Sequence, residues 1–107
     1  MMLTIALIKT GSAWDTGTVA DEERLLGEHV AYVRQLAEHG DVIQSGMILA
    51  PGERPGADGL VGMILFATDI DRARELASAC PATVAGMVRC EVHPWYLTAA
   101  AAPARTG

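Results

Sequence analysis

The chain has 107 residues, of which 50% are hydrophobic and 20% are charged, and its formal net charge is −5. This length fits one domain that can bury a core without metal or disulfide cross-links. The acidic balance and the scattered basic residues argue against nucleic acid or an anionic membrane surface as a partner. No apolar run is long enough to span a membrane and no signal-peptide pattern is present, so we expect a cytoplasmic protein.

The cysteines and histidines do not follow the spacings of metal or redox motifs. Cys80 and Cys90 lack the C-x-x-C arrangement, so reduced, independent thiols are the expectation. His29, His39 and His93 share no ligand spacing such as H-x-x-x-H. We therefore predict neither a metal site nor a bound cofactor.

The first half of the chain predicts a strand, a helix and a second strand. Leu3–Lys9 is a nearly continuous apolar run, which is typical of a central strand covered on both faces. The period becomes helical over Asp21–Glu38, and Gly40 marks the end of that helix. Its apolar arc contains Leu25, Leu26, His29, Val30, Val33, Leu36 and Ala37. Asp41–Leu49 reads as the second strand, and residues 51–59, rich in Gly and Pro, as a loop.

The second half predicts a strand, a helix and a last strand. Leu60–Thr68 is largely apolar, and a helix is expected from Ile70 to about Cys80, closed by Pro81. Met87–Trp95 alternates between apolar and polar residues, as a strand with one covered face does. Residues 97–107 are rich in Ala without periodicity, and we expect a disordered tail after a domain of residues 1–96.

The order β-α-β-β-α-β predicts an α+β, ferredoxin-like fold with a four-stranded antiparallel sheet. Right-handed crossovers would put the first and third strands in the middle and both helices on one face. The other face also carries apolar residues, so we expect a homodimer formed through this open sheet face. If Val88, Cys90 and Val92 face the helices, Arg89, Glu91 and His93 line the open face.

His29 is the main candidate for chemistry because an imidazole interrupts an otherwise apolar helical face. It can be a neutral core histidine bonded to a backbone carbonyl, or a general acid or base that titrates near neutrality. Cys80 projects inward from the second predicted helix and can be a buried thiol, or a nucleophile or weak acid facing His29. Its expected position at a helix C-terminus disfavours the thiolate.

Five further residues are candidates for substrate binding. Gly46 allows a ligand to approach the second strand beside Ser45, although a bulge at a sheet edge would equally explain the glycine. Trp14 offers an aromatic wall, though a tryptophan there also suits a dimer interface. Arg89 and His93 would contribute polar groups to a dimer cleft, or form a solvated charge row with Glu91.

At the level of ordered segments, residues 1–96 resemble the YciI-like (YCII-related) family of the dimeric α/β-barrel superfamily. The segments are E-H-V-A-Y-V-R-Q-L-A-E-H-G, V-I-Q-S-G-M, D-I-D-R-A-R-E-L-A and P-A-T-V-A-G-M-V-R-C-E-V-H-P-W. The A-C-P…G…E-V-x-P pattern is also similar to the DGPF branch of this fold. The resemblance implies a dyad of a first-helix histidine and an aspartate that precedes a proline. His29 occupies the histidine position, whereas Cys80-Pro81 replaces Asp-Pro.

The relatives named by this resemblance include a dehydrohalogenase of hydroxylated aromatics, lactone isomerases, polyketide cyclases and cofactor-free monooxygenases. It therefore implies a pocket for a small aromatic or enolisable compound with one acid–base residue. We expect a cofactor-independent lyase, isomerase or cyclase that uses His29. A non-catalytic dimer that binds a small ligand or acts as an accessory subunit is the alternative, and a cofactor-free monooxygenase is a third.

Overall fold

The computed structural model describes residues 2–48, 50, 52 and 54–100 and contains a single four-stranded sheet. Its regular elements are, in chain order, β1 (Met2–Thr10), α1 (Val19–Glu38), β2 (Val42–Met47), a 3-10 turn η1 (Ala57–Gly59), β3 (Leu60–Phe66), α2 (Ile70–Ser78), α3 (Pro81–Val84) and β4 (Val88–Tyr96). The strand order is β2-β3-β1-β4, and every neighbouring pair is antiparallel. The first and third strands are therefore central, as predicted from the crossover rule.

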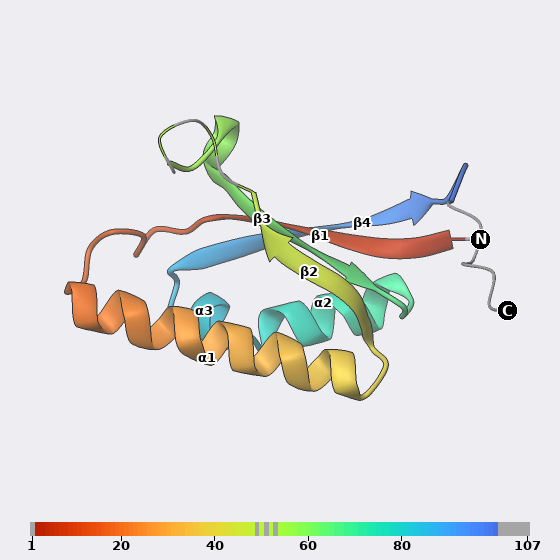
Figure 1. The fold of residues 1–107 in the computed structure, drawn as a ribbon, viewed down its shortest axis with the longest axis horizontal. Helices are drawn as coiled ribbons and strands as arrows, with labels where there is room; N and C mark the ends of the chain where they lie inside the picture. The colour runs from red at the N-terminus through yellow and green to blue at the C-terminus, as the bar shows by residue number, and fades with distance from the viewer. Residues whose placement is uncertain (1, 49, 51, 53, 101–107) are drawn as a thin grey trace, which may run out of the picture.

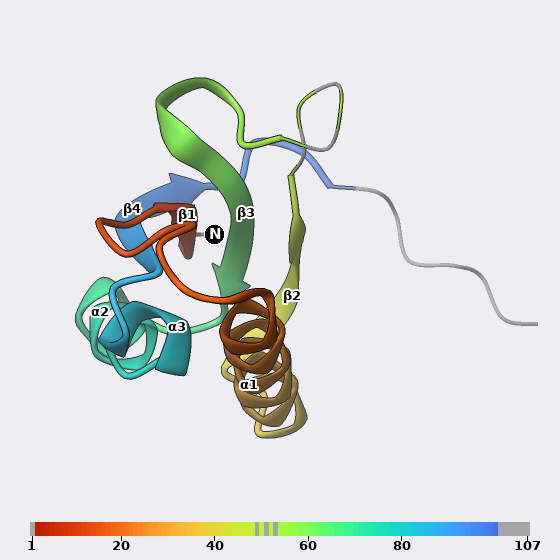
Figure 2. The same cartoon turned by 90° about the vertical axis from the view of Figure 1, so that its left-hand side faces the viewer.

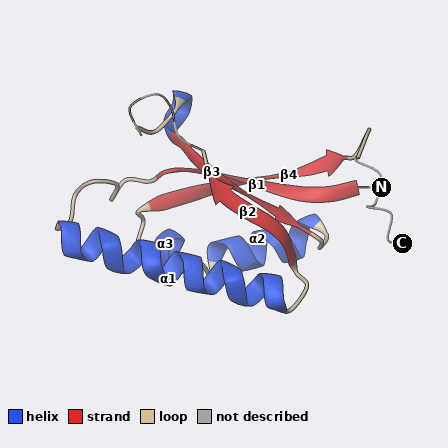
Figure 3. Ribbon diagram, viewed as in Figure 1, coloured by secondary structure: helices blue, strands red, loops and turns tan. Residues whose placement is uncertain are grey.

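The helices form one layer and the sheet the other (Figure 1). Turned by 90°, the molecule shows α1 beneath β2 and β3, and α2 and α3 beneath β1 and β4, while the loop that carries η1 lies on the opposite side (Figure 2). The colouring by element shows the same two layers (Figure 3). The predicted α+β, ferredoxin-like arrangement is confirmed.

Helix α1 begins two residues earlier than predicted because Thr18, outside the predicted helix, is its N-cap. The Thr18 side chain accepts a hydrogen bond from the N–H of Asp21, which satisfies one of the free donors of the first turn. The chain leaves the helix at Gly40, whose φ of 85° is in the left-handed region. Asp41 N–H then donates to the carbonyl of Leu36, so the turn leads directly into β2.

The predicted second helix corresponds to α2, and a short helix that was not predicted, α3, follows it. Asp69 caps α2 by accepting from Arg72 N–H, and the helix ends at Ser78, two residues before the predicted end near Cys80. Cys80 has extended backbone angles and is the N-cap residue of α3, and Pro81 is at the start of that helix, where its missing N–H costs nothing. Pro81 therefore opens a new helix, and the prediction that Cys80 lies at a helix C-terminus is wrong.

The residues of helix α1 that are fully buried are Val33 and Leu36, both in its second half. Val33 and Leu36 are each 7% exposed, whereas Leu26 and Val30, which lie one to two turns closer to the helix start, are 40% and 37% exposed. The core beneath the second half contains Phe66 and other buried apolar residues of the sheet and of α2. The apolar arc predicted for α1 is thus divided into a part that is buried in the core and a part that is not.

Two register shifts bend the sheet near β3. One lies between Ile8 and Lys9 in the β1–β3 pair, and the other lies between Val42 and Gln44 in the β2–β3 pair. The second leaves Ile43 as the extra residue of a bulge on the edge strand. Ser45 and Gly46 pair regularly with β3, so the bulge interpretation proposed for Gly46 applies instead to Ile43.

The sheet face away from the helices carries its own apolar strip. Strand alternation puts Ala6 and Ile8 in the core, which leaves Leu3, Ile5 and Leu7 of β1 on the other face together with Met63 of β3. These four residues are half-buried within a single chain. The sequence-based expectation of apolar residues on both faces of β1 is thus met.

Replacement of the fully buried Phe66 should test the core directly. Phe66→Ala removes a ring that is 0% exposed and is expected to lower the free energy of unfolding by about 3–5 kcal/mol, through lost burial and a residual cavity. Tyr96→Ala is the matched control, since Tyr96 is 68% exposed and its loss should change stability by no more than about 0.5 kcal/mol. Urea denaturation of both variants measures this, and equal effects would contradict the assigned core.

Candidate functional site

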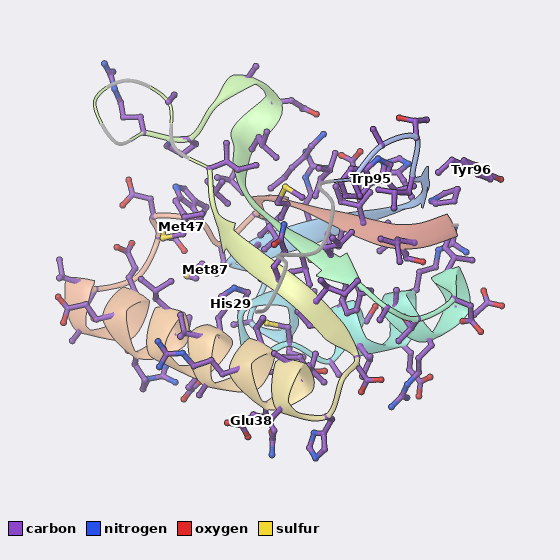
Figure 4. The ribbon with its side chains drawn as sticks, turned by 45° about the vertical axis from the view of Figure 1, so that its right-hand side comes forward. His29, Glu38, Met47, Met87, Trp95 and Tyr96 are labelled. Carbon is purple, nitrogen blue, oxygen red and sulfur yellow. The ribbon has the colours of Figure 1, made fainter. Side chains whose placement is uncertain are left out.

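A cavity of about 510 Å³ lies between α1 and the sheet. Its walls are mostly apolar side chains, and this volume suits a small organic molecule. Figure 4 shows His29, Met47 and Met87 in the space between α1 and β2, and these three residues all line the cavity. The other apolar lining residues are Ile8, Trp14, Val19, Leu26, Val30, Val33, Val61, Ala82 and Val88.

His29 is the only histidine among the described residues that lines this cavity. Its Nδ1 lies 3.0 Å from Sγ of Cys80, within the range of a hydrogen bond to sulfur. No partner for Nε2 is found among the described residues, and none of their buried side-chain nitrogen or oxygen atoms lacks a partner. Nε2 must therefore be open to the cavity. Burial lowers the pKa of the His29 ring from its ordinary value of 6.5, because the charged form loses water contacts.

Cys80 supports the histidine from behind the cavity wall. It is 2% exposed and does not line the cavity. Burial raises the pKa of its thiol, and this effect is only partly opposed by the peptide N–H groups of Ala82 and Thr83 and by the Thr83 hydroxyl. The thiol therefore stays protonated because it is buried. The sequence had suggested a different cause, the dipole at a helix C-terminus.

Trp14 reaches the cavity on a loop that is tied to the start of β4. Gly11 N–H donates to the carbonyl of Met87, and Ala13 N–H donates to the carbonyl of Gly86. A side chain at Gly11 would collide with the Gly86 carbonyl at 2.3 Å, so this contact requires glycine. The close approach of the two loops places Trp14 at the cavity wall, as the sequence analysis proposed for an aromatic wall.

The edge strand and its neighbour form the floor of the cavity. Ser45, Gly46 and Gly62 all line it. A Cβ atom at Gly62 would lie 2.8 Å from the carbonyl oxygen of Gly46, whereas a Cβ at Gly46 would meet nothing within 4 Å. The Ser45 hydroxyl donates to the carbonyl of Met63, which leaves its oxygen free to accept but not to donate. In this conformation Ser45 can therefore contribute a hydrogen-bond acceptor, but not a donor, to a ligand in the cavity.

Charged groups border the apolar lining. Asp15, Glu22 and Glu23 line the cavity together with Arg34, and no ion pair involving these four is found in the described part of the chain. Arg34 was not among the residues predicted from the sequence, because this arginine falls on the polar arc of α1. Its signal was its position four residues after Val30, on the same side of the helix.

Arg89 and His93 lie outside the cavity. They form a charge cluster with Lys9, Asp58 and Glu91. The Lys9 ammonium lies 2.5 Å from both Asp58 Oδ2 and Glu91 Oε2, and these contacts raise the pKa of Lys9 and lower those of the two carboxyls. Lys9, Glu91 and His93 alternate with the core residues of β1 and β4, so the cluster lies on the open sheet face. A substrate-binding role for Arg89 and His93 in a dimer cleft stays a prediction.

Two searches of the described residues bear on other classes of site. No group of three or more His, Cys, Asp or Glu side chains that could hold a metal ion occurs in this part of the chain. Within the same residues, neither α1 nor a shorter helix has the length and apolar character of a membrane span. The tail prediction for residues 97–107 falls partly outside the description, because only residues 97–100 are included, and these have no regular structure.

The sequence from residue 2 to residue 96 matches the family of YCII-related domains. The chain belongs to this family. The 5-chloro-2-hydroxyhydroquinone dehydrochlorinase TftG from Burkholderia phenoliruptrix, solved in complex with 2,5-dihydroxybenzoquinone, has a similar structure, with a TM-score of 0.60 and 18% sequence identity. The match covers 90% of this chain and 94% of that chain, and at this identity it supports the fold alone. No curated protein matches this YCII-related chain significantly.

The lowered pKa of His29 predicts how stability should depend on pH. Below the ordinary pKa of about 6.5, the unfolded chain binds a proton that the folded ring does not yet bind, so the free energy of unfolding falls as the pH is lowered toward the folded pKa. Above that value the ring is neutral in both states and contributes no slope. Chemical denaturation of wild type and His29→Gln between about pH 5 and 8 isolates this contribution. The stability difference between them should favour wild type less at the acidic end, and the opposite trend would contradict a depressed pKa.

Proposed function

We propose that this YCII-related protein is a cofactor-independent enzyme that uses His29 to move a proton during elimination, isomerisation or cyclisation of a small aromatic or enolisable compound. The observation that supports this most strongly is the position of His29, whose ring borders an apolar cavity of about 510 Å³ while Cys80 contacts its Nδ1. A free ring nitrogen in a water-poor cavity is the arrangement that general acid–base catalysis requires.

The surroundings of His29 favour proton transfer over a purely structural role. A core histidine with both nitrogens satisfied by backbone groups would have no contact with a ligand. Here the only neighbour found for Nδ1 is a thiol, and no described group pairs with Nε2. Because burial lowers the pKa of His29, the ring is neutral at pH 7 and carries both a donor and an acceptor nitrogen.

The charges at the cavity narrow the substrate class. Three carboxylates, of Asp15, Glu22 and Glu23, face one guanidinium, of Arg34, so the border is negative as a whole. A carboxylate or phosphate substrate would meet repulsion there. Neutral phenols, hydroquinones and ketones fit better, and the apolar walls, including Trp14, suit a ring. The dehydrochlorinase of similar fold acts, by its name, on a chlorinated hydroxyhydroquinone, which is consistent with this class.

Removal of the imidazole is the direct test. Across a panel of chlorinated hydroquinones and enolisable ketones, followed by chloride release and by ultraviolet spectra, we expect wild type to turn over at least one compound. His29→Gln should then lose about 10²–10⁴-fold in kcat, the usual contribution of one positioned acid–base group. His39→Gln is the matched control, because His39 lies exposed at the other end of α1.

Two outcomes would sink the proposal. Equal turnover by wild type and by folded His29→Gln would remove His29 from the chemistry. Binding of a phenol that perturbs the His29 resonances, without turnover of any compound in the panel, would favour the alternative of a non-catalytic ligand-binding dimer.

We also propose that two chains associate through the open sheet face. The apolar strip of Leu3, Ile5, Leu7 and Met63 is half-buried in one chain and would be covered by a second copy. The cluster beside it contains two cations, Lys9 and Arg89, and two anions, so its charges are mutually compensated before association.

A charge placed in this strip should separate the dimer. Ile5→Lys puts an ammonium where the second sheet would pack, and it should halve the mass measured by analytical ultracentrifugation. Val84→Lys is the control, since Val84 is 74% exposed on α3, in the helix layer. A single-chain mass of 11.3 kDa for wild type at micromolar concentration would contradict the proposal.

A further inference from the structure

The contact between His29 and Cys80 defines which nitrogen of the imidazole carries the proton. Sulfur lies on the Nδ1 side of the ring at 3.0 Å, and Nε2 is directed to the cavity. In a neutral imidazole one nitrogen donates and the other accepts, and the partner of one nitrogen determines the role of the other. The neighbour of Nδ1 therefore determines whether Nε2 is a hydrogen-bond donor or an acceptor toward the cavity.

From this geometry we infer that Cys80 is a positioning residue that donates its S–H to Nδ1 of His29 and so holds the ring in the tautomer that presents an Nε2–H donor to the cavity. The inference rests on the proposed function only for its consequence in catalysis. In this tautomer the His29 side of the cavity presents a hydrogen-bond donor. The site then favours ligands with an acceptor oxygen at that position, such as the carbonyl of a ketone or quinone.

The alternative hydrogen bond satisfies fewer groups. If Nδ1–H donated to sulfur, the S–H of Cys80 would have to use the Thr83 hydroxyl as its acceptor, and the sulfur, which the N–H groups of Ala82 and Thr83 already approach, would have to accept a further hydrogen bond in a site that is 2% exposed. Thiol sulfur is a weak acceptor, whereas an unprotonated imidazole nitrogen is a good one. With S–H directed to Nδ1, the thiol proton and both ring nitrogens are used, since Nε2–H can bond a ligand or water in the cavity.

The ion pair of an imidazolium and a thiolate is also disfavoured. Burial lowers the pKa of His29 and raises that of Cys80, so both shifts oppose transfer of the thiol proton to the ring. The charged groups that line the same cavity are Asp15, Glu22, Glu23 and Arg34, and no contact between them and the His29 ring is found among the described residues. The contact between His29 and Cys80 is therefore one between a neutral imidazole and a neutral thiol.

A carboxylate in place of the thiol would reverse the polarity. An ionised Asp side chain can only accept, so it would take Nδ1–H and leave an unprotonated Nε2 toward the cavity. The side chain at residue 80 therefore determines whether Nε2 of His29 is a hydrogen-bond donor or an acceptor. Substitution at residue 80 is then expected to invert the tautomer without moving His29.

Long-range proton–nitrogen NMR of the full-length protein at about pH 7.5, above the ordinary histidine pKa, tests this without any ligand. His29→Gln assigns the ring signals. We expect Nδ1 of His29 to resonate as an unprotonated, imine-type nitrogen and Nε2 as a protonated, pyrrole-type nitrogen. In Cys80→Asp the two patterns should exchange and the pKa of His29 should rise, and in Cys80→Ala the signals should move toward a mixture of tautomers.

The results that overturn the inference are distinct from those that overturn the proposed function. A wild-type ring protonated on Nδ1 alone, or on both nitrogens, would refute the donor polarity, while turnover that depends on His29 would still stand. Identical tautomer ratios in wild type and Cys80→Ala would refute the role of Cys80. Cys80→Ser is the conservative variant, and its hydroxyl should preserve the wild-type pattern.

Discussion

The anchoring of α1 by its second half is the constraint on which the rest of this structure depends. Val33 and Leu36 fasten the helix to the core, and Leu26 and Val30 one to two turns earlier have no core to enter. A helix is a rigid rod that rises about 1.5 Å per residue, so it cannot bend inward to close the space beneath the turns that precede Val33. The cavity is what remains between this rod and the sheet, and His29 lies about one turn before Val33, the first buried residue of the helix.

The same constraint gives the histidine its chemistry. A wall made of aliphatic side chains removes water from the ring and disfavours its charged form, while the thiol behind it offers one weak hydrogen bond. Neither feature would arise on a solvent-exposed helix, where His39 lies. Local apolar surroundings and a single buried partner therefore distinguish His29, within α1, from His39 at the C-cap of the same helix as a candidate for proton transfer.

Periodicity in the sequence predicted the fold well and the site only in part. Alternation in β4 and the apolar run of β1 indicated which faces are covered, because each strand residue points to one of two sides. The helical arc of α1 correctly included Leu26, His29 and Val30 on the inner side. It could not show that the first two turns overlie a cavity, because periodicity gives the direction of a side chain and not the distance to the opposing layer.

The same limit applies to residues whose role depends on close approach or on local backbone. Cys80 was expected at a helix end because Pro81 usually stops a helix, but proline is equally suited to the first turn of a new one. Nothing in the sequence distinguishes Gly62 within its apolar strand, although a side chain at this position would collide with the backbone of β2. The meeting of His29 with Cys80 joins residues 51 positions apart and requires the tertiary arrangement.

The close approach of Gly62 to the Gly46 carbonyl also indicates which parts of the cavity lining can accept other side chains and which cannot. The floor there is main chain against main chain, so no side chain at Gly62 can reshape it without displacing the edge strand. The opposite wall is different, because Leu26, Val30 and Arg34 project from α1 and are not packed into the core. Divergence of substrate preference among proteins with this fold would thus proceed by exchanging side chains along one helix, while the position of Gly62 in the floor stays fixed.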